Sequence, residues 1–414
     1  MVASSEPSDI RPRRRIRLLD SYAGLLSEPA VRGFVAFGLL GRMAISMLSL
    51  GIILMVSGLT GSYGTAGLIS GISVLAGAIG QPMLGRLADR QGQGRVIAFS
   101  IPLHCVGLVL LVAFAVGSMP TWVLAAAAVL TGGAYPPIGS FVRARWAERL
   151  GGSKRLTAAY ALESVVDELI FVTGPVLVTL LATRVHATAG LAAAFLVTVV
   201  GGIGFARQRG TEPSRQHPGG KRSFVLRQPA VLFVTLCTLA TGVAFGALDV
   251  AVVAFTAAEG VPWAAGLVLA LFAAGSAVGG LTFGAIPWRV DPLTRLAGSG
   301  TLLGVVFLPL AFLPSIGWLV GFAFLSGIAI APLIVSGTTL VQHRVRKDGL
   351  TESLTWVTTG ILVGVAVGSW VCGRVADATD GMGGFLVVTP AACAATAVVW
   401  LAWLRLRRDR NGAG

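Results

Sequence analysis

Charged residues are scarce in this chain. Only 12% of its 414 residues are Asp, Glu, Lys or Arg, whereas 55% are hydrophobic and the mean hydropathy is +0.81. A soluble protein of this length needs a charged exterior, and no polar stretch is long enough to form a soluble domain. The shortage of charge therefore argues against a water-soluble protein and indicates a chain that is solvated by lipid.

The sequence also lacks the patterns of several kinds of chemistry. It has no phosphate-binding glycine loop, no cluster of metal ligands and no nucleophile elbow. We therefore predict that the protein is not an enzyme and that it has no cofactor and no metal site. The cysteines lie in apolar runs without metal-ligand spacing and are interpreted as buried thiols: Cys105, Cys237, Cys372 and Cys393.

Apolar runs of membrane-spanning length recur along the whole chain. About twenty apolar residues cross a bilayer as a helix, so the runs predict an all-α membrane protein with twelve transmembrane helices. We place them at about 33–56, 63–84, 95–117, 120–142, 159–183, 188–206, 229–256, 262–285, 295–314, 316–341, 352–373 and 383–404. Residues 1–32 are polar and basic, so we expect no cleavable signal peptide and an export signal in the first helix.

Weak internal similarity divides these helices into two pseudo-symmetric bundles of six. Ala-Gly-Leu at 66–68 recurs at 265–267, and a similar offset places Pro137 on Pro332. Duplicated bundles of this kind place a solute site at their interface near the bilayer midplane. The predicted parts are an N-terminal segment (1–32), a first bundle (33–206), a linker (207–227), a second bundle (228–404) and a tail (405–414).

The basic residues fall on one side of this arrangement. Of the 32 Lys and Arg residues, only Arg184 and Arg374 lie on the other side, and Arg42 lies within the first helix. Because positive loops stay in the cytoplasm, both termini and the linker are predicted to be cytoplasmic. The same rule accounts for the net charge of +14 without a nucleic-acid partner. The excess of Arg over Lys, with abundant Ala, Gly and Val, suggests a bacterial inner membrane.

The segment between the second and third helices carries a recognisable motif. Residues 85–95 read Gly-Arg-Leu-Ala-Asp-Arg-Gln-Gly-Gln-Gly-Arg, which resembles a signature of the major facilitator superfamily. The resemblance implies two six-helix bundles that rock about a central cavity, with Asp89 in a conformational latch formed with Gly85, Arg90 and Gly92. From the residues alone, Gly85 would let the second helix pack tightly, and Asp89 could instead be a solvated turn carboxylate.

The fifth predicted helix contains three acids, Glu163, Asp167 and Glu168. Each would cost about 2.5 to 3.5 kcal/mol as an unpaired ion at the bilayer centre. Glu163 and Asp167 share one helix face by their spacing, and Arg42 lies at a matching depth, about 12 to 14 Å from the cytoplasmic end at 1.5 Å per residue. We predict that Arg42 pairs with Asp167 or Glu163. One of the acids then exchanges a proton during transport, or the pair is purely structural.

Two further segments have weaker parallels. Thr173-Gly174-Pro175 resembles part of the glycine-proline motif of drug/proton antiporters, although Leu162, Ile170 and Val178 stand where that motif has further glycines. Gly174 and Pro175 could equally form a proline kink cushioned by glycine. Residues 373–377, Gly-Arg-Val-Ala-Asp, echo residues 85–89, and we assign them no role.

Six residues are candidates for the cavity or its gate, and Gly174 and Pro175 are two of them. In the resembled superfamily, helices 1, 4, 7 and 10 line the cavity, which draws attention to Tyr135 and Pro137 in the fourth helix and to Pro332 in the tenth. Asp249, near the outer end of the seventh helix, could be a gate or a cation contact, or could be solvated near the interface.

These observations predict a secondary active transporter that works by alternating access. The leading hypothesis is proton-coupled efflux of a small amphipathic compound. A proton-coupled importer, a lipid translocator and a non-transporting receptor or scaffold of the same fold are the alternatives. The expected partners are a small-molecule solute, protons and membrane lipids, and we expect a monomer.

Overall fold

The computed structural model describes residues 25–26, 28–151, 154–214, 228–312, 315–345 and 350–411. Within these ranges all regular structure is helical, without a strand. Most of the predicted N-terminal segment and linker residues 215–227 lie outside the described residues.

The described chain contains twelve helices that are long and apolar enough to cross a membrane. The first six spans are α2 (Pro29–Thr60), α3 (Tyr63–Gln91), α4 (Gln93–Val116), α5 (Thr121–Gly133) with α6 (Ile138–Leu150), α7 (Lys154–Arg184) and α8 (Ala189–Arg207). The other six are α9 (Pro229–Ala258), α10 (Ala264–Ala285), α11 (Pro292–Phe307) with the short η3 (Leu308–Phe312), α12 (Ile316–Ile328) with α13 (Ile330–Arg344), α14 (Leu350–Ala378) and α15 (Phe385–Asn411). The predicted fold class is confirmed, and the protein is a multi-pass membrane protein.

Two of the spans are broken at prolines. Between α5 and α6 the chain leaves the helix at residues 134–137, where Pro136 and Pro137 remove two successive backbone donors. Between α12 and α13 the break falls at Ala329, because the ring of Pro332 is incompatible with a regular helix at the preceding turn. Both breaks thus lie at or close before a proline, and the first of them separates α5 from α6.

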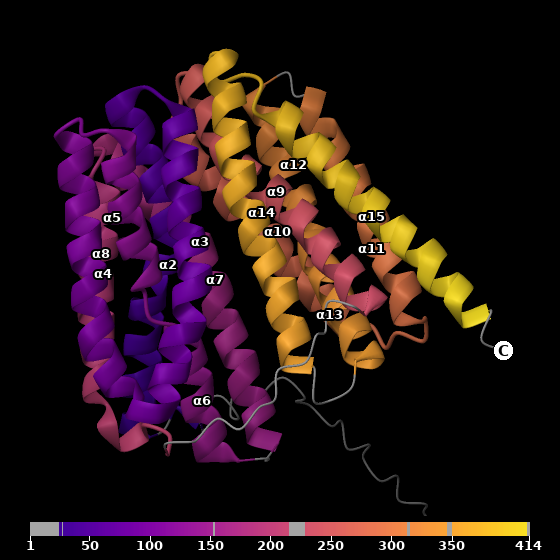
Figure 1. The fold of residues 1–414 in the computed structure, drawn as a ribbon, viewed down its shortest axis with the longest axis horizontal. Helices are drawn as coiled ribbons and strands as arrows, with labels where there is room; N and C mark the ends of the chain where they lie inside the picture. The colour runs from indigo at the N-terminus through magenta and orange to yellow at the C-terminus, as the bar shows by residue number, and fades with distance from the viewer. Residues whose placement is uncertain are drawn as a thin grey trace, which may run out of the picture.

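The two bundles stand side by side and meet through two helix pairs, α3 with α14 and α7 with α10 (Figure 1). We call the end at which α2 begins and α15 ends the linker end, and the opposite end the far end. In Figure 1 the bundles converge at the far end, at the top of the view, and splay apart toward the linker end, where α6 and α13 lie.

Among the described residues, the close backbone contacts between the bundles lie in the far half of the seam. A methyl group on Gly67 of α3 would lie 2.0 Å from the carbonyl oxygen of Ser369 in α14, and one on Gly373 would lie 2.2 Å from that of Tyr63. Toward the linker end, a methyl group on Gly85 or on Gly284 of α10 would meet no atom within 4 Å. The described conformation is therefore closed at the far end and open at the linker end.

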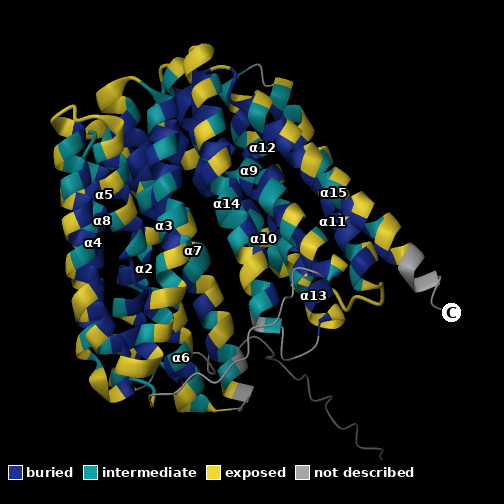
Figure 2. Cartoon of the chain, viewed as in Figure 1, coloured by how far each residue is buried: buried dark blue, intermediate teal, exposed yellow. Residues whose placement is uncertain are grey.

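Burial follows the arrangement of the helices (Figure 2). Residues in the second halves of α2 and α9, such as Ile52, Ile53 and Val252, have no exposed surface. Large apolar side chains are exposed around the outside, including Trp122 (74%), Leu281 (69%) and Phe312 (78%). An apolar exterior around a packed interior suits helices that contact lipid chains.

Candidate functional site

An ion-pair network joins the first and fifth spans at the level predicted from the sequence. Arg42 of α2 donates from Nη2 to Oε2 of Glu163 at 2.5 Å and from Nη1 to Oδ1 of Asp167 at 2.8 Å. Both Arg42 and Asp167 lie thirteen residues after the start of their helices, about 20 Å along each axis at 1.5 Å per residue. The helices begin earlier than predicted, so both residues lie farther from their helix starts than the predicted 12 to 14 Å, but at matching positions along the two helices.

Glu163 is the buried member of this network. Its side chain has no exposed surface, and its second oxygen, Oε1, accepts a hydrogen bond of 2.8 Å from the indole Nε1 of Trp146 in α6. Arg42 is also nearly buried, with a side-chain exposure of 6%, and its Nε donates to the carbonyl oxygen of Gly38 at 3.1 Å. Buried charges are tolerated when they are paired and hydrogen-bonded, and both conditions are met by Arg42 and Glu163.

Asp167 and a second arginine form the accessible part of the network. Arg143 of α6 donates from Nη2 to Oδ2 of Asp167 at 2.6 Å. The side chains of Asp167 and Arg143 are 29% and 45% exposed, so both can be reached from the space beside them. The sequence analysis counted Arg143 only among the basic residues that set the membrane orientation. The sequence does not show in which direction α6 continues after the break at residues 134–137, so the contact with α7 was not predicted.

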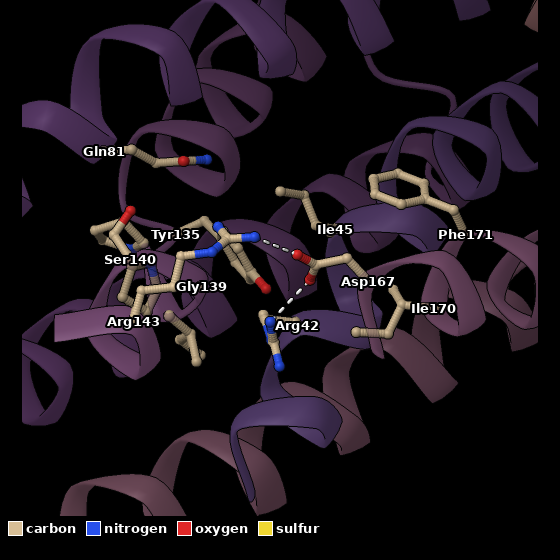
Figure 3. A pocket seen from close by; sticks show the side chains of 13 residues that line it. Arg42, Ile45, Gln81, Tyr135, Gly139, Ser140, Arg143, Asp167, Ile170 and Phe171 are labelled. Atoms are coloured by element: carbon tan, nitrogen blue, oxygen red, sulfur yellow. Dashed lines mark hydrogen bonds and ion pairs between the residues drawn. The ribbon is translucent and has the colours of Figure 1, made fainter. Parts of the chain in front are cut away.

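A cavity of about 250 Å³ opens beside this pair (Figure 3). Its wall contains both polar and apolar side chains, and all the lining residues come from the N-terminal bundle. They are Arg42, Ile45, Gln81, Tyr135, Pro136, Pro137, Ile138, Gly139, Ser140, Arg143, Asp167, Ile170 and Phe171. Figure 3 shows Arg42 and Arg143 approaching Asp167 from different directions. The arrangement can hold a small amphipathic molecule next to a titratable carboxyl group.

The structure separates the predicted cavity residues into two groups. Tyr135 and Pro137 line the cavity, and the Tyr135 hydroxyl donates to the carbonyl oxygen of Gly41 at 2.5 Å. Gly174, in contrast, faces α2, where a methyl group would lie 1.9 Å from the hydroxyl oxygen of Ser46. The carbonyl of Pro175 faces Gly266 of α10 in the seam between the bundles.

Pro332 lines a different cavity, in the C-terminal bundle between α10, α11 and the break before α13. Two predicted acids stand apart from the ion-pair network. Glu168 and Asp249 are half-buried, and neither forms an ion pair or hydrogen bond with a residue in the described part of the chain. In the same part of the chain, no group of His, Cys, Asp and Glu residues could hold a metal ion.

The motif at the end of α3 is more helical than predicted. α3 continues to Gln91, so Gly85, Asp89 and Arg90 are helical and the turn to α4 is the single residue Gly92. Gly92 has φ +99°, a conformation that favours glycine. The expected tight packing at Gly85 was wrong, because a methyl group there would meet open space. Asp89 is exposed and contacts no partner among the described residues in this conformation.

A second acid, missed by sequence reasoning, joins the bundles at the far end. Asp377 of α14 accepts hydrogen bonds at the start of α3, from the amide nitrogens of Tyr63 (2.6 Å) and Gly64 (2.9 Å) and from the hydroxyl of Ser62 (2.9 Å). Free amides and the positive end of the helix dipole favour a carboxylate there. The available signal was the repetition of residues 85–89 at 373–377.

Replacing Asp377 by Ala is expected to open the far end. The change removes the acceptor for two backbone amides, an effect of about 0.5 to 2 kcal/mol for a helix cap, or about 2- to 30-fold in the population of the closed form. Distances between spin labels at the far ends of α3 and α14 would measure it. Asp380→Asn is the matched control, because Asp380 is exposed in the adjacent turn and makes no hydrogen bond to a described residue. Equal distance distributions in the two variants would contradict the assignment.

Comparisons with known proteins agree with this architecture. A family model described as Major Facilitator Superfamily matches residues 34–369, and no curated protein matches the chain. The structure of the nucleoside transporter NupG has a TM-score of 0.71 at 12% identity, covering 91% of this chain and 98% of that one. A bacterial homologue of the iron transporter ferroportin, in its inward-facing state, has a TM-score of 0.69 at 14% identity, covering 94% and 100%. In an outward-facing state, such a homologue has a TM-score of 0.61 at 14% identity, covering 90% and 99%. At these identities the similarity concerns the fold alone.

Proposed function

The chain belongs to the major facilitator superfamily, and on that basis we propose that it is a proton-coupled secondary transporter that moves a small amphipathic solute by alternating access. The observation that carries the proposal is the cavity beside Asp167, in which a titratable acid, two arginines and an apolar wall meet within the membrane-spanning part of the protein. Intramembrane ionisable groups are costly and mark solute or proton pathways.

We assign the linker end to the cytoplasm of a bacterial inner membrane. The distribution of basic residues supports this orientation. In this assignment the described conformation admits a solute from the cytoplasm.

Two equivalent latches would then alternate. In the described conformation Asp377, at the C-terminal end of α14, binds the start of α3. Asp89 occupies the corresponding place at the C-terminal end of α3, in the same Gly-Arg-x-Ala-Asp pattern, and would bind the start of α14 at Leu350 when the linker end closes. Asp377 would thus stabilise the state closed at the far end, and Asp89 the state closed at the linker end. This correspondence supports the proposed latch role of Gly85, Asp89, Arg90 and Gly92.

Asp167 is the proposed coupling residue. Glu163 is sealed between Arg42 and Trp146, whereas Asp167 is open to the cavity. A proton on Asp167 would weaken its bonds to Arg42 and Arg143 and change the charge of the cavity wall. Glu168 lacks an arginine partner in the described chain, so its protonation would not be transmitted in this way.

The direction of transport depends on what competes for Asp167. In an efflux antiporter, a cationic solute and a proton compete for the carboxylate. In a proton-coupled importer, an anionic solute and a proton bind together. The sequence analysis predicts efflux. Import of an anionic solute is the second candidate, and the second arginine bonded to Asp167 supports it.

Flux measurements in proteoliposomes test the proposal. The full chain, reconstituted with an imposed pH gradient, is expected to move at least one compound from a panel of cationic, anionic and neutral aromatics in a gradient-dependent way. Protein-free vesicles and the Asp167→Asn variant are the controls. If no compound in the panel shows gradient-dependent flux, the result would contradict proton-coupled transport and favour a receptor or scaffold of the same fold.

A further inference from the structure

The charge that the cavity presents to an incoming molecule is that of Arg143. Its side chain is the most exposed of the four in the network, at 45%, against 29% for Asp167, 6% for Arg42 and none for Glu163. A guanidinium has five N–H donors, and Arg143 donates to a single described acceptor, Oδ2 of Asp167. Its remaining donors are available on the cavity side.

The carboxylate is less available than the guanidinium. Each oxygen of Asp167 already accepts a bond from a different arginine, at 2.8 and 2.6 Å. Among the other elements beside α7, α8 has no ionisable residue before Arg207 and α10 has none. Across the cavity, α3 contributes the neutral Gln81, and on α7 itself Glu168 follows Asp167. A cation entering the cavity would therefore have to displace Arg143 before it reached an acid.

We propose that the cavity binds an anionic group of the solute at Arg143, and that this anion and a proton on Asp167 bind together. The inference rests on the proposed transport function and specifies its solute class. Two arginines and two acids make the network neutral; a proton on Asp167 leaves one positive charge uncompensated, on the side chain that faces the cavity. A planar guanidinium binds carboxylate, sulfonate or phosphate oxygens through paired N–H bonds.

The rest of the cavity limits the size and character of this anion. Ile45 and Phe171 supply apolar surface beside the charged groups, about one helical turn after Arg42 and Asp167 on the same helices, and Phe171 is 46% exposed. A cavity of about 150 Å³ holds benzene, so about 250 Å³ accommodates a single ring that carries one acidic group. Since anion and proton bind cooperatively, each raises the affinity for the other, and both cross the membrane in the same direction.

Binding of three single-ring probes with fixed charge tests the proposal: benzenesulfonate, benzyltrimethylammonium and benzamide. With the purified full chain in detergent, affinity is measured from the ligand-dependent rise in melting temperature. Benzenesulfonate is expected to bind best, and more tightly at pH 5.5 than at pH 8. Arg143→Gln should weaken it at least about tenfold, as expected for loss of a hydrogen bond to a charged group. Arg143→Lys should retain part of the affinity.

A change at Asp167 is expected to alter anion binding in the opposite direction to the change at Arg143. Asp167→Asn imitates the protonated acid, so it should bind benzenesulfonate more tightly than the wild type at pH 8 and with little pH dependence. Arg149→Gln is the matched control, because Arg149 lies on the same helix, α6, pairs with Glu28 and is remote from this cavity; it should bind like the wild type.

A preference for benzyltrimethylammonium that Asp167→Asn abolishes and Arg143→Gln strengthens would overturn the anion assignment. If pH-gradient-driven flux persisted, that result would leave the proposed transport function intact. Binding of none of the probes would also overturn the assignment. Absence of gradient-dependent flux for the whole compound panel would remove the transport function itself, so the two failures are distinguishable.

Discussion

Replacing Arg42 by Gln is expected to lower the free energy of unfolding by about 3 to 5 kcal/mol, the usual cost of removing one partner of a buried ion pair. Glu163 would keep the Trp146 bond but lose its counter-ion in a site without exposed surface. Asp167 would keep Arg143 alone. The measurements are the unfolding midpoint in detergent and the yield of folded protein from the membrane.

Two companion variants isolate the cause. Arg42→Gln combined with Glu163→Gln removes both charges and should recover most of the lost stability, because a neutral pair carries no uncompensated ion. Arg149→Gln breaks the more exposed pair with Glu28 and should cost only about 0 to 1 kcal/mol. A similar loss in Arg42→Gln and Arg149→Gln would show that the buried network is not the stabilising element described above.

Replacing Gly67 by Ala is expected to prevent full closure of the far end. The added methyl group would lie 2.0 Å from the Ser369 carbonyl oxygen, and a backbone atom cannot rotate away as a side chain can. Overpacking of this kind costs about 1 to 3 kcal/mol, which corresponds to about a 5- to 150-fold loss of the closed form. Spin-label distances across α3 and α14 would lengthen, and gradient-driven flux would fall by a similar factor.

Gly85→Ala is the matched control for this prediction. It makes the same chemical change in the same helix, at a position where a methyl group meets no atom within 4 Å. It should leave the far-end distances unchanged and gain slightly in helix stability. If the far-end distances in Gly67→Ala were the same as those in Gly85→Ala, the close contact between Gly67 and the Ser369 carbonyl would be contradicted.

The sequence contained enough to predict the architecture, because hydrophobic length and the placement of arginines are properties of the chain itself. The meeting of Arg42 with the acids of α7 was also predictable, since an unpaired charge at that depth is costly and Arg42 is the cation that the sequence places well inside a predicted span. Helix ends were less predictable: α3 continues to Gln91, through a charged segment that hydropathy alone places outside the membrane.

The missed features depend on relative placement. Whether Arg143 faces the cavity or the outside of the protein at the linker end is decided by the direction in which the chain leaves the break at residues 134–137. The role of Asp377 depends on which helix starts beside it across the seam. At Gly85 a contact was predicted that the structure does not have. A glycine in a helix permits a close neighbour but does not show that one is present.

The count of protons carried with the solute tests the central claim most directly. It is measured in proteoliposomes with an internal pH dye, using a compound that shows gradient-dependent flux. We expect proton movement coupled to the solute in the wild type and in Glu168→Gln, and solute binding without coupled proton movement in Asp167→Asn. Undiminished coupling in Asp167→Asn would contradict the assignment of Asp167 as the residue that carries the proton.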